Sequence, residues 1–373
     1  MRIVSIASAR PNFVKLASLV HAIGESNEKP FGRAQDKLQT KNEKLDHVII
    51  HTGQHYDPLL SDVFFEELGI PKPNENLEVK GGVSNADTVA RTRQALLPIL
   101  KKMKPDLVLV YGDVSGALGG AKAASELHIP IAHIEAGLRS FDESMPEEGN
   151  RKAIDHLATF LFVTEKSGMK NLEDENVTEG VHFVGNTMID TLSRMLALVE
   201  KEQLPIALPP CFGVVTLHRP SNVDEGSHLK KVMQFLSDLS LECPLIFPIH
   251  PRTRAALGSE SPISAPLHLC DPLGYLAFLK LVKQASFVLT DSGGIQEEAT
   301  FLKKKCFTLR KNTERPSTIE SGSNTLIDLE SLDDREQVLL YAKDPKPLSV
   351  SLPPLWDGRA GERIMEILTA ALP

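Results

Sequence analysis

The sequence predicts an α/β protein of two domains, each a parallel β-sheet covered by helices. Short apolar segments alternate with amphipathic helical stretches along the chain, which is typical of buried parallel strands joined by helices. This alternation starts again after Val184-Gly185-Asn186, and 373 residues exceed what one compact core usually holds. We therefore expect residues 1–184 and 185–357 to form two doubly wound domains that face a ligand cleft.

Nine segments have the composition of buried strands: 3–7, 48–51, 107–111, 131–134, 160–164, 213–217, 245–249, 287–290 and 306–309. The polar segment 25–45 has no apolar period and predicts an insertion rather than a site. A final helix within 358–373 carries apolar residues on one side and can pack on either domain, including back on the first.

Composition excludes several classes of protein. With 42% hydrophobic residues, 24% charged residues and a net charge of −8, the chain reads as soluble and globular, with neither nucleic acid nor an anionic membrane as its main partner. The apolar run at the N-terminus is too short for a signal peptide, and no 18-residue apolar stretch follows, so we expect a cytoplasmic protein. Four cysteines without metal-ligand spacing predict reduced, buried thiols.

The segment Thr290-Asp291-Ser292-Gly293-Gly294-Ile295-Gln296-Glu297-Glu298 joins a buried strand to a helix through a glycine turn. A phosphate suits such a turn because the helix presents free N–H groups and the positive end of its dipole. The two glutamates would repel an anion, so at least one should meet a neutral hydroxyl such as that of a ribose. An ordinary strand-to-helix turn fits this segment equally well when it is taken alone.

Polar side chains also follow strand ends in the first half of the chain. Arg10 and Lys15 frame the start of a helix and suit a diphosphate, although both are equally compatible with a solvated surface. Asp113 lies just after the expected strand 107–111, where a role in helix capping explains an aspartate as well as a role in catalysis does. Alternation places Glu135 on the same face as His133, which makes it a candidate base or acid.

Three further loops add candidates. Glu147 and Glu148 open a helix, where acids commonly sit only to suit the helix dipole. In the second half, His218-Arg219 and His250 follow strands; a lone histidine is usually structural, but two at neighbouring strand ends point to a site. Arg315 follows the strand after the glycine turn and can reach the same phosphate.

Absent motifs narrow the function. The chain has no G-x-G-x-x-G after its first strand, no G-x-x-x-x-G-K-[ST] and no HExxH. Nicotinamide dehydrogenases, P-loop nucleotidases and zinc hydrolases therefore lose their main support, and we expect no metal.

The ordered set of motifs resembles UDP-N-acetylglucosamine 2-epimerases. Besides the 290–298 segment, the resemblance rests on Arg10-Pro11, Lys15, Gly112-Asp113, His133-Ile134-Glu135-Ala136-Gly137-Leu138-Arg139, Pro146-Glu147-Glu148, Asn150-Arg151, Gly185-Asn186-Thr187, His218-Arg219 and Thr313-Glu314-Arg315-Pro316. It implies two Rossmann-like domains of glycosyltransferase B type, a homodimer, a UDP-sugar substrate and no cofactor. The implied catalytic residues are Asp113, Glu135, Glu147 and His218, and the implied substrate-binding residues are Arg10, Lys15, Phe278, Ser292, Gly293, Gly294, Glu298 and Arg315.

The resemblance implies a reaction that eliminates UDP to give 2-acetamidoglucal and then adds it back to the other face, which requires a base and an acid. Two departures from the family pattern are Gly112-Asp113-Val114-Ser115 and His218-Arg219-Pro220-Ser221, and residues 54–57 match an allosteric segment only in part. A hydrolysing relative that releases free N-acetylmannosamine, a glycosyltransferase of the same fold and a non-catalytic UDP-sugar sensor remain alternatives.

Overall fold

The computed structural model describes residues 1–28, 44–53, 64–257 and 266–372. Residues 54–57 and most of the expected insertion lie outside these ranges. The chain divides into a first unit, Met1–Arg194 with Pro354–Pro373, and a second unit, Met195–Pro353. This division falls inside helix α7 (Thr187–Lys201), whereas the boundary expected from the sequence precedes that helix.

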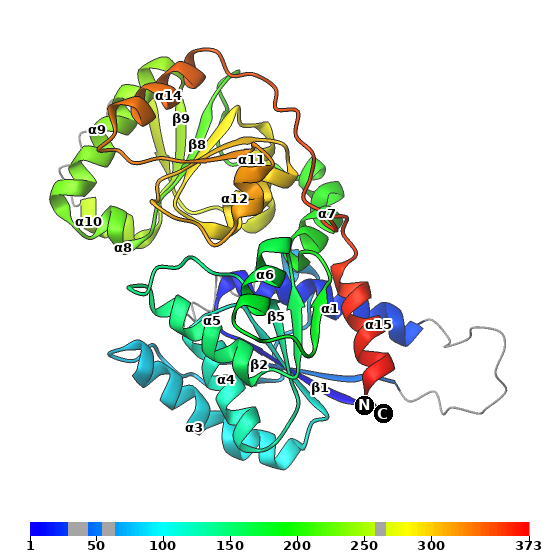
Figure 1. Cartoon of the computed structure of the whole chain (residues 1–373). Helices are drawn as coiled ribbons and strands as arrows, with labels where there is room; N and C mark the ends of the chain where they lie inside the picture. The colour runs from blue at the N-terminus through cyan, green and yellow to red at the C-terminus, as the bar shows by residue number, and fades with distance from the viewer. Residues whose placement is uncertain (29–43, 54–63, 258–265, 373) are drawn as a thin grey trace. The chain divides into compact units, whose positions relative to one another are not determined.

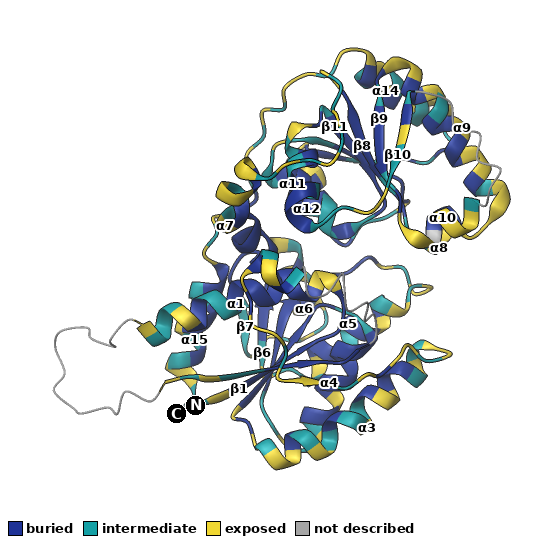
Figure 2. Cartoon of the chain, turned by 180° about the vertical axis from the view of Figure 1, so that it is seen from behind, coloured by how far each residue is buried: buried dark blue, intermediate teal, exposed yellow. Residues whose placement is uncertain are grey.

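The first unit contains a seven-stranded parallel sheet in the order β3-β2-β1-β4-β5-β6-β7. Its central strands are buried on both faces because helices cover the sheet on each side, as Figure 2 shows. The strands are β1 (Arg2–Ala7), β2 (Asp46–His51), β3 (Glu75–Asn76), β4 (Leu107–Tyr111), β5 (Ile131–Ala136), β6 (Phe160–Val163) and β7 (Val181–Phe183).

The helices of the first unit are α1 (Arg10–Glu28), α3 (Asn85–Met103), α4 (Ser115–Glu126), α5 (Pro146–Leu157), α6 (Lys166–Asp174), α7 and α15 (Ala360–Ala371). The last of these, from the C-terminal end of the chain, lies along α1 (Figure 1). Asp190 holds it there, because its carboxylate accepts hydrogen bonds from Ser18 Oγ (2.7 Å) and from the backbone N–H groups of Ala360 (3.1 Å) and Gly361 (2.7 Å). These bonds cap the start of α15 and join three helices.

The second unit is also a parallel sheet that alternates with helices, here with six strands in the order β10-β9-β8-β11-β12-β13. Its strands are β8 (Gly213–Thr216), β9 (Leu245–Pro248), β10 (Leu267–Cys270), β11 (Phe287–Thr290), β12 (Lys305–Thr308) and β13 (Asn324–Leu326). Its helices are α8 (Pro220–Val223), α9 (Gly226–Glu242), α10 (Pro251–Leu257), α11 (Tyr275–Gln284), α12 (Gly293–Phe301), α13 (Pro316–Glu320) and α14 (Leu332–Lys343).

The predicted fold class is confirmed: two parallel sheets alternate with helices, and all nine expected strands are present. Four short strands, β3, β7, β10 and β13, were not expected from the sequence. The expectation that the thiols are buried holds for Cys243 and Cys306 but was wrong for two others: Cys270 is half-buried, and Cys211, which precedes β8, is exposed. Within the described part of the chain, no helix is long and apolar enough to cross a membrane.

Candidate active site

In the first unit, Lys15 and Glu135 form an ion pair although both side chains are almost completely buried. Lys15 lies in the second turn of α1, and Glu135 lies at a bulge near the end of β5 with φ of +75°. The bulge interrupts the alternation from which the direction of Glu135 was expected. Gly112 leaves room for the pair, since a Cβ atom at that position would lie 2.9 Å from Lys15 Nζ.

Asp113 follows β4 and forms an ion pair with Arg151 Nη2 on α5. Its backbone carbonyl accepts a hydrogen bond from Asn150 Nδ2 at 2.8 Å. The residue at the N-cap of α4 is Val114, so Asp113 is not the N-cap residue that the alternative interpretation required. Arg151 thus ties the aspartate after β4 to the helix that carries Glu147, which is half-buried.

Glu148, next to Glu147 on α5, is fully buried and has a different environment. Its carboxylate accepts hydrogen bonds from Ser140 N (2.9 Å), Ser140 Oγ (2.7 Å), Phe141 N (3.1 Å) and Arg151 Nη1 (2.5 Å). Burial alone would raise the pKa of Glu148, but these donors hold it below its ordinary value. Glu148 therefore fixes the loop before α5.

His133 is a structural histidine. Its ring lies fully buried between Asp155 Oδ1 (Nδ1, 2.6 Å) and the carbonyl of Gly112 (Nε2, 2.9 Å). Asp155 also pairs with Arg139 at 2.8 Å. Burial would raise the pKa of Asp155, but His133 and Arg139 lower it. The sequence offered no signal for Asp155, which lies in the last turn of α5 and 22 residues from His133.

In the second unit, Asp291 fixes the histidine that follows β8. Its buried carboxylate accepts hydrogen bonds from the backbone N–H groups of His218 (3.0 Å) and Arg219 (2.8 Å), and from Asn222 Nδ2 (3.1 Å). The ring Nδ1 of His218 lies 3.0 Å from the same carboxylate. Burial would raise the pKa of Asp291, but these partners lower it, so the ionised carboxylate accepts from Nδ1–H. Nε2 of the partly exposed ring is then the nitrogen that can meet a ligand.

The glycine turn begins α12 directly at Gly293. Ser292 occupies the N-cap, but its side chain makes no capping bond, so it does not satisfy the first N–H groups of the helix. Arg315 lies against this turn: a Cβ atom on Gly293 would stand 2.9 Å from its Cζ atom. The Arg315 guanidinium contacts Glu297 through Nε (3.0 Å) and Glu314 through Nη1. A helix N-terminus and an arginine therefore meet at the predicted phosphate position.

Two more arginines surround Glu314. Arg310 Nη2 lies 2.8 Å from Glu314 Oε2, and Arg219 Nη2 lies 3.9 Å from Glu314 Oε1. Arg310 is 8% exposed, and its buried Nη1 has no hydrogen-bond partner among the described residues. Burial lowers the pKa of Arg310, and the neighbouring arginines lower it further against the effect of Glu314. Sequence reasoning missed Arg310, although its place just after β12 was a usable signal.

Glu298, on the first turns of α12, is an incompletely paired buried acid. Tyr275 donates a hydrogen bond to its Oε1 at 3.1 Å, while Oε2 has no partner among the described residues. Burial raises the pKa of Glu298 to about 8, with a further contribution from Glu297. Tyr275 was overlooked in the sequence although it begins α11, the helix of Phe278. Phe278 itself is half-buried and packs against the apolar core under the sheet.

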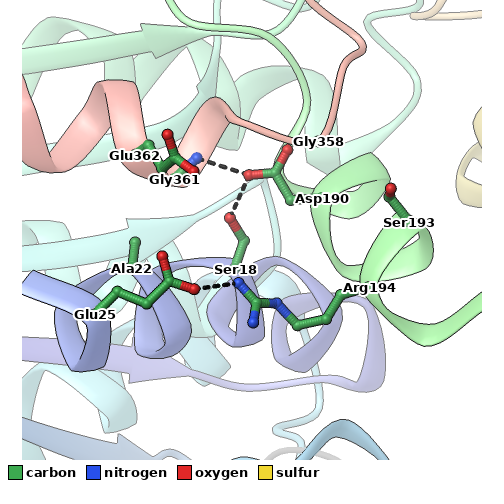
Figure 3. Close-up of a pocket in the computed structure, with 9 residues that line it drawn as sticks. All are labelled: Ser18, Ala22, Glu25, Asp190, Ser193, Arg194, Gly358, Gly361 and Glu362. Carbon is green, nitrogen blue, oxygen red and sulfur yellow. Dashed lines mark hydrogen bonds and ion pairs between the residues drawn. The ribbon is translucent and has the colours of Figure 1, made fainter. Parts of the chain in front are cut away.

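The candidate residues thus form two groups, one in each unit. Arg10, exposed at the start of α1, makes no ion pair with another described residue. A hollow of about 230 Å³ in the first unit, shown in Figure 3, is lined by α1, α7 and the start of α15 and contains none of the candidates. Among the described residues, no group of three His, Cys, Asp or Glu side chains is placed to hold a metal ion.

Comparison with known proteins identifies the family. A sequence model of the UDP-N-acetylglucosamine 2-epimerase family matches residues 37–369. The chain belongs to this family. The protein is accordingly an enzyme of the UDP-N-acetylglucosamine 2-epimerase family.

The sequence of this epimerase family member matches those of its relatives over most of its length. The UDP-N-acetylglucosamine 2-epimerase of Methanocaldococcus jannaschii is 36% identical over 390 residues, which covers 99% of both chains. A UDP-2,3-diacetamido-2,3-dideoxy-D-glucuronate 2-epimerase of Pseudomonas aeruginosa is 37% identical over 333 residues, 88% of each chain.

Solved structures extend the comparison. The Methanocaldococcus jannaschii UDP-GlcNAc 2-epimerase in complex with UDP-GlcNAc and UDP has a TM-score of 0.87 at 35% identity, with both chains completely covered. The glycosyltransferase SnogD of Streptomyces nogalater, at 13% identity and a TM-score of 0.50, covers 100% of this chain and 99% of its own, and shares the fold alone.

Proposed function

We propose that the protein is a non-hydrolysing 2-epimerase that interconverts UDP-N-acetylglucosamine and UDP-N-acetylmannosamine. The observation that carries this proposal is the incomplete polar site at α12. There, a helix N-terminus whose N-cap side chain makes no capping bond, Arg315, and two buried atoms without a hydrogen-bond partner among the described residues, Arg310 Nη1 and Glu298 Oε2, lie within one unit. Unmet buried donors suit a diphosphate, and an unmet carboxyl oxygen suits a ribose hydroxyl.

The proposed binding roles follow from these groups. Ser292, Gly293, Gly294 and Arg315 hold the diphosphate, with Arg10 and Lys15 assigned to the same ligand by resemblance. Glu298 binds the ribose, and Phe278 lies near the uracil. A similar chain in complex with UDP-GlcNAc and UDP supports this assignment.

The diphosphate is also the proposed leaving group. In the elimination, the bond between sugar carbon 1 and the diphosphate oxygen breaks, and the proton on carbon 2 is removed, which gives 2-acetamidoglucal and UDP. Negative charge accumulates on the departing diphosphate, where arginines and a helix N-terminus stabilise it. Addition of UDP to the glucal with protonation on the opposite face gives the epimer.

Asp113, Glu135 and Glu147 share the roles of base and acid in this proposal. Glu148 is not assigned one, because four donors already occupy its carboxylate. Arg151 and Lys15 hold Asp113 and Glu135 in place through ion pairs. His218, oriented by Asp291, offers Nε2 to the departing diphosphate.

The test is to incubate the protein with UDP-N-acetylglucosamine in heavy water and to follow the sugar by proton NMR. Nucleotide-linked N-acetylmannosamine with deuterium at carbon 2 is the expected product. Free N-acetylmannosamine and UDP indicate the hydrolysing alternative. Because one relative is named for a diacetamido-glucuronate substrate, the corresponding UDP-sugar is assayed in parallel, and exclusive turnover of it would replace the proposed sugar.

Variants test the catalytic residues. Asp113→Asn and Glu147→Gln should each lower deuterium incorporation by at least about a hundredfold, since each removes a proton-transfer group, while UDP affinity stays nearly unchanged. Glu143→Gln is the matched control, because Glu143 is an exposed acid paired only with Lys152 on the outside of the same region. Full exchange in both Asp113→Asn and Glu147→Gln would rule out these assignments.

A further inference from the structure

A second group of basic side chains lies in the second unit, at the end of the sheet where β11 and β12 begin. The glycine turn lies at the other end of these strands. A hollow of about 280 Å³ is lined by Lys303, Lys304, Lys305 and Lys346, with Ser286 and Tyr341 as the other polar side chains used here. Ser286 precedes β11 and Lys305 begins β12, whereas the glycine turn follows the far end of β11. The two places are therefore separated by the length of β11, roughly 13 Å.

The charges around this hollow are not balanced. No aspartate or glutamate is among the described residues that line it. Lys346 pairs with Asp344, and Lys305 donates to Thr325 Oγ1 at 2.7 Å. Lys303 and Lys304 form no ion pair with any described residue. In a chain with a net charge of −8, such a local excess of ammonium groups is unexpected for an ordinary surface.

Lysine crowding also has an energetic cost that a ligand can relieve. Burial lowers the pKa of Lys304, and the nearby Lys283 lowers it further. Burial likewise lowers the pKa of Lys305. A bound anion would reverse both effects, because opposite charge favours the protonated ammonium.

We propose that this hollow binds a small multivalent phosphate anion, of the size of pyrophosphate or the diphosphate of a nucleotide. Its volume is slightly below the lower end of the range typical of drug-sized ligand sites, roughly 300 Å³. Four lysines from two segments line it, 303–305 at the start of β12 and 346 after α14. The anion joins the body of the second unit to the segment that leads from α14 towards Pro354.

The inference does not depend on the proposed epimerase reaction, and the test keeps the two apart. Binding of inorganic pyrophosphate to the full-length protein is measured by titration calorimetry in the wild type and in Gly293→Ala, whose added methyl group displaces Arg315 at the α12 site. Binding with unchanged affinity in the variant is expected. Complete loss of pyrophosphate binding in Gly293→Ala would overturn the proposal.

Two variants locate the binding. Lys304→Gln and Lys346→Gln should each weaken pyrophosphate binding by about tenfold, as expected for loss of one charge-assisted contact. Lys230→Gln, which removes one exposed lysine on α9, should change the affinity less than about twofold by the same reasoning. Equal losses in all three variants would show unspecific attraction and would overturn the site.

Titration with a nucleotide shows whether the anion is inorganic pyrophosphate or the diphosphate of a nucleotide. ADP is titrated under the same conditions into Gly293→Ala, in which the α12 site is disturbed. Tighter binding of ADP than of pyrophosphate, lost again in Lys304→Gln, supports the site with a nucleotide as its ligand. Binding of pyrophosphate alone, with the same dependence on Lys304, supports it with an inorganic ligand.

Discussion

The two groups of candidate residues differ in how completely their charges are paired within their own unit. In the first unit, buried Glu135 is paired with Lys15, and buried Glu148 is paired with Arg151 and three further donors. In the second unit, Glu298 has a tyrosine on one oxygen and no described partner on the other, and Arg310 Nη1 has none.

This difference indicates two tasks. A buried polar group without a partner costs about 1–3 kcal/mol, so the unmet atoms at α12 are explained by a ligand that completes them. The ion pairs of the first unit instead hold its acids in fixed positions, as the geometry of proton transfer requires. Binding is therefore assigned mainly to the second unit and proton transfer mainly to the first.

The largest expected effect comes from breaking the buried pair of the first unit. Lys15→Met leaves the Glu135 carboxylate buried without its cation and should lower the free energy of unfolding by about 3–5 kcal/mol. Urea denaturation measures this loss. The double variant Lys15→Met/Glu135→Gln should recover part of it, because the uncompensated charge is gone. Additive losses in the double variant would contradict the pairing.

Glu298 should give a pH dependence of stability with the opposite sign to that of Glu148. The pKa of Glu298 in the folded protein is about 8, against about 4.3 for an unfolded glutamate. Between these values the folded state binds more protons, so the free energy of unfolding falls as pH rises, by up to about 1.4 kcal/mol per pH unit. Glu148, with its pKa held low, stabilises above about pH 4.3 and loses this effect on acidification.

Glu298→Gln removes the contribution of Glu298 to the pH dependence of stability. Urea denaturation of the wild type and of Glu298→Gln at pH 5, 6.5 and 8 should show the wild type losing stability relative to the variant as pH rises. A difference that stays constant over this range would mean that Glu298 is already ionised at pH 5.

Interior and edge strands show how much of the fold the sequence could predict. The nine expected strands are all interior to the two sheets, where burial on both faces leaves a continuous apolar segment such as Leu107–Tyr111. The four unexpected strands, β3, β7, β10 and β13, are the four sheet edges. β3, for example, is two exposed residues, Glu75–Asn76. An edge strand bonds on one side only, so its sequence carries little apolar signal.

The site divides in a similar way. Motifs that follow strand ends made Asp113, His218 and the glycine turn candidates, because parallel strands bring their carboxyl ends to one end of a sheet. Their partners were not predictable: Arg151 is 38 residues from Asp113, and Asp291 is 73 residues from His218. Such pairs exist only once the chain has folded, and one sequence does not contain the distances that define them.

A smaller effect, on UDP affinity, should show whether the glycine turn is a binding site or only the start of a helix. A Cβ atom on Gly293 would overlap Arg315 Nη1 and lie 2.9 Å from Glu314 Oε1, so Gly293→Ala displaces the arginine. UDP affinity should fall by about tenfold, the equivalent of about 1.4 kcal/mol. Gly226→Ala, at the start of α9 with nothing within 4 Å of the new atom, is the control and should leave the affinity unchanged. Equal affinities in both variants would remove Arg315 from the binding site.

The smallest expected effect concerns α5, which carries Glu147 and Glu148. A Cβ atom on Gly149 would meet nothing within 4 Å, so Gly149→Ala should raise the free energy of unfolding by about 0.5–1 kcal/mol through higher helix propensity. Because the ion pairs of Arg151 already fix this helix, epimerisation should stay within about twofold of the wild type, as measured by the NMR assay. A stabilised variant with strongly reduced turnover would show that α5 must bend during the reaction, and the first unit would then supply motion as well as fixed charges.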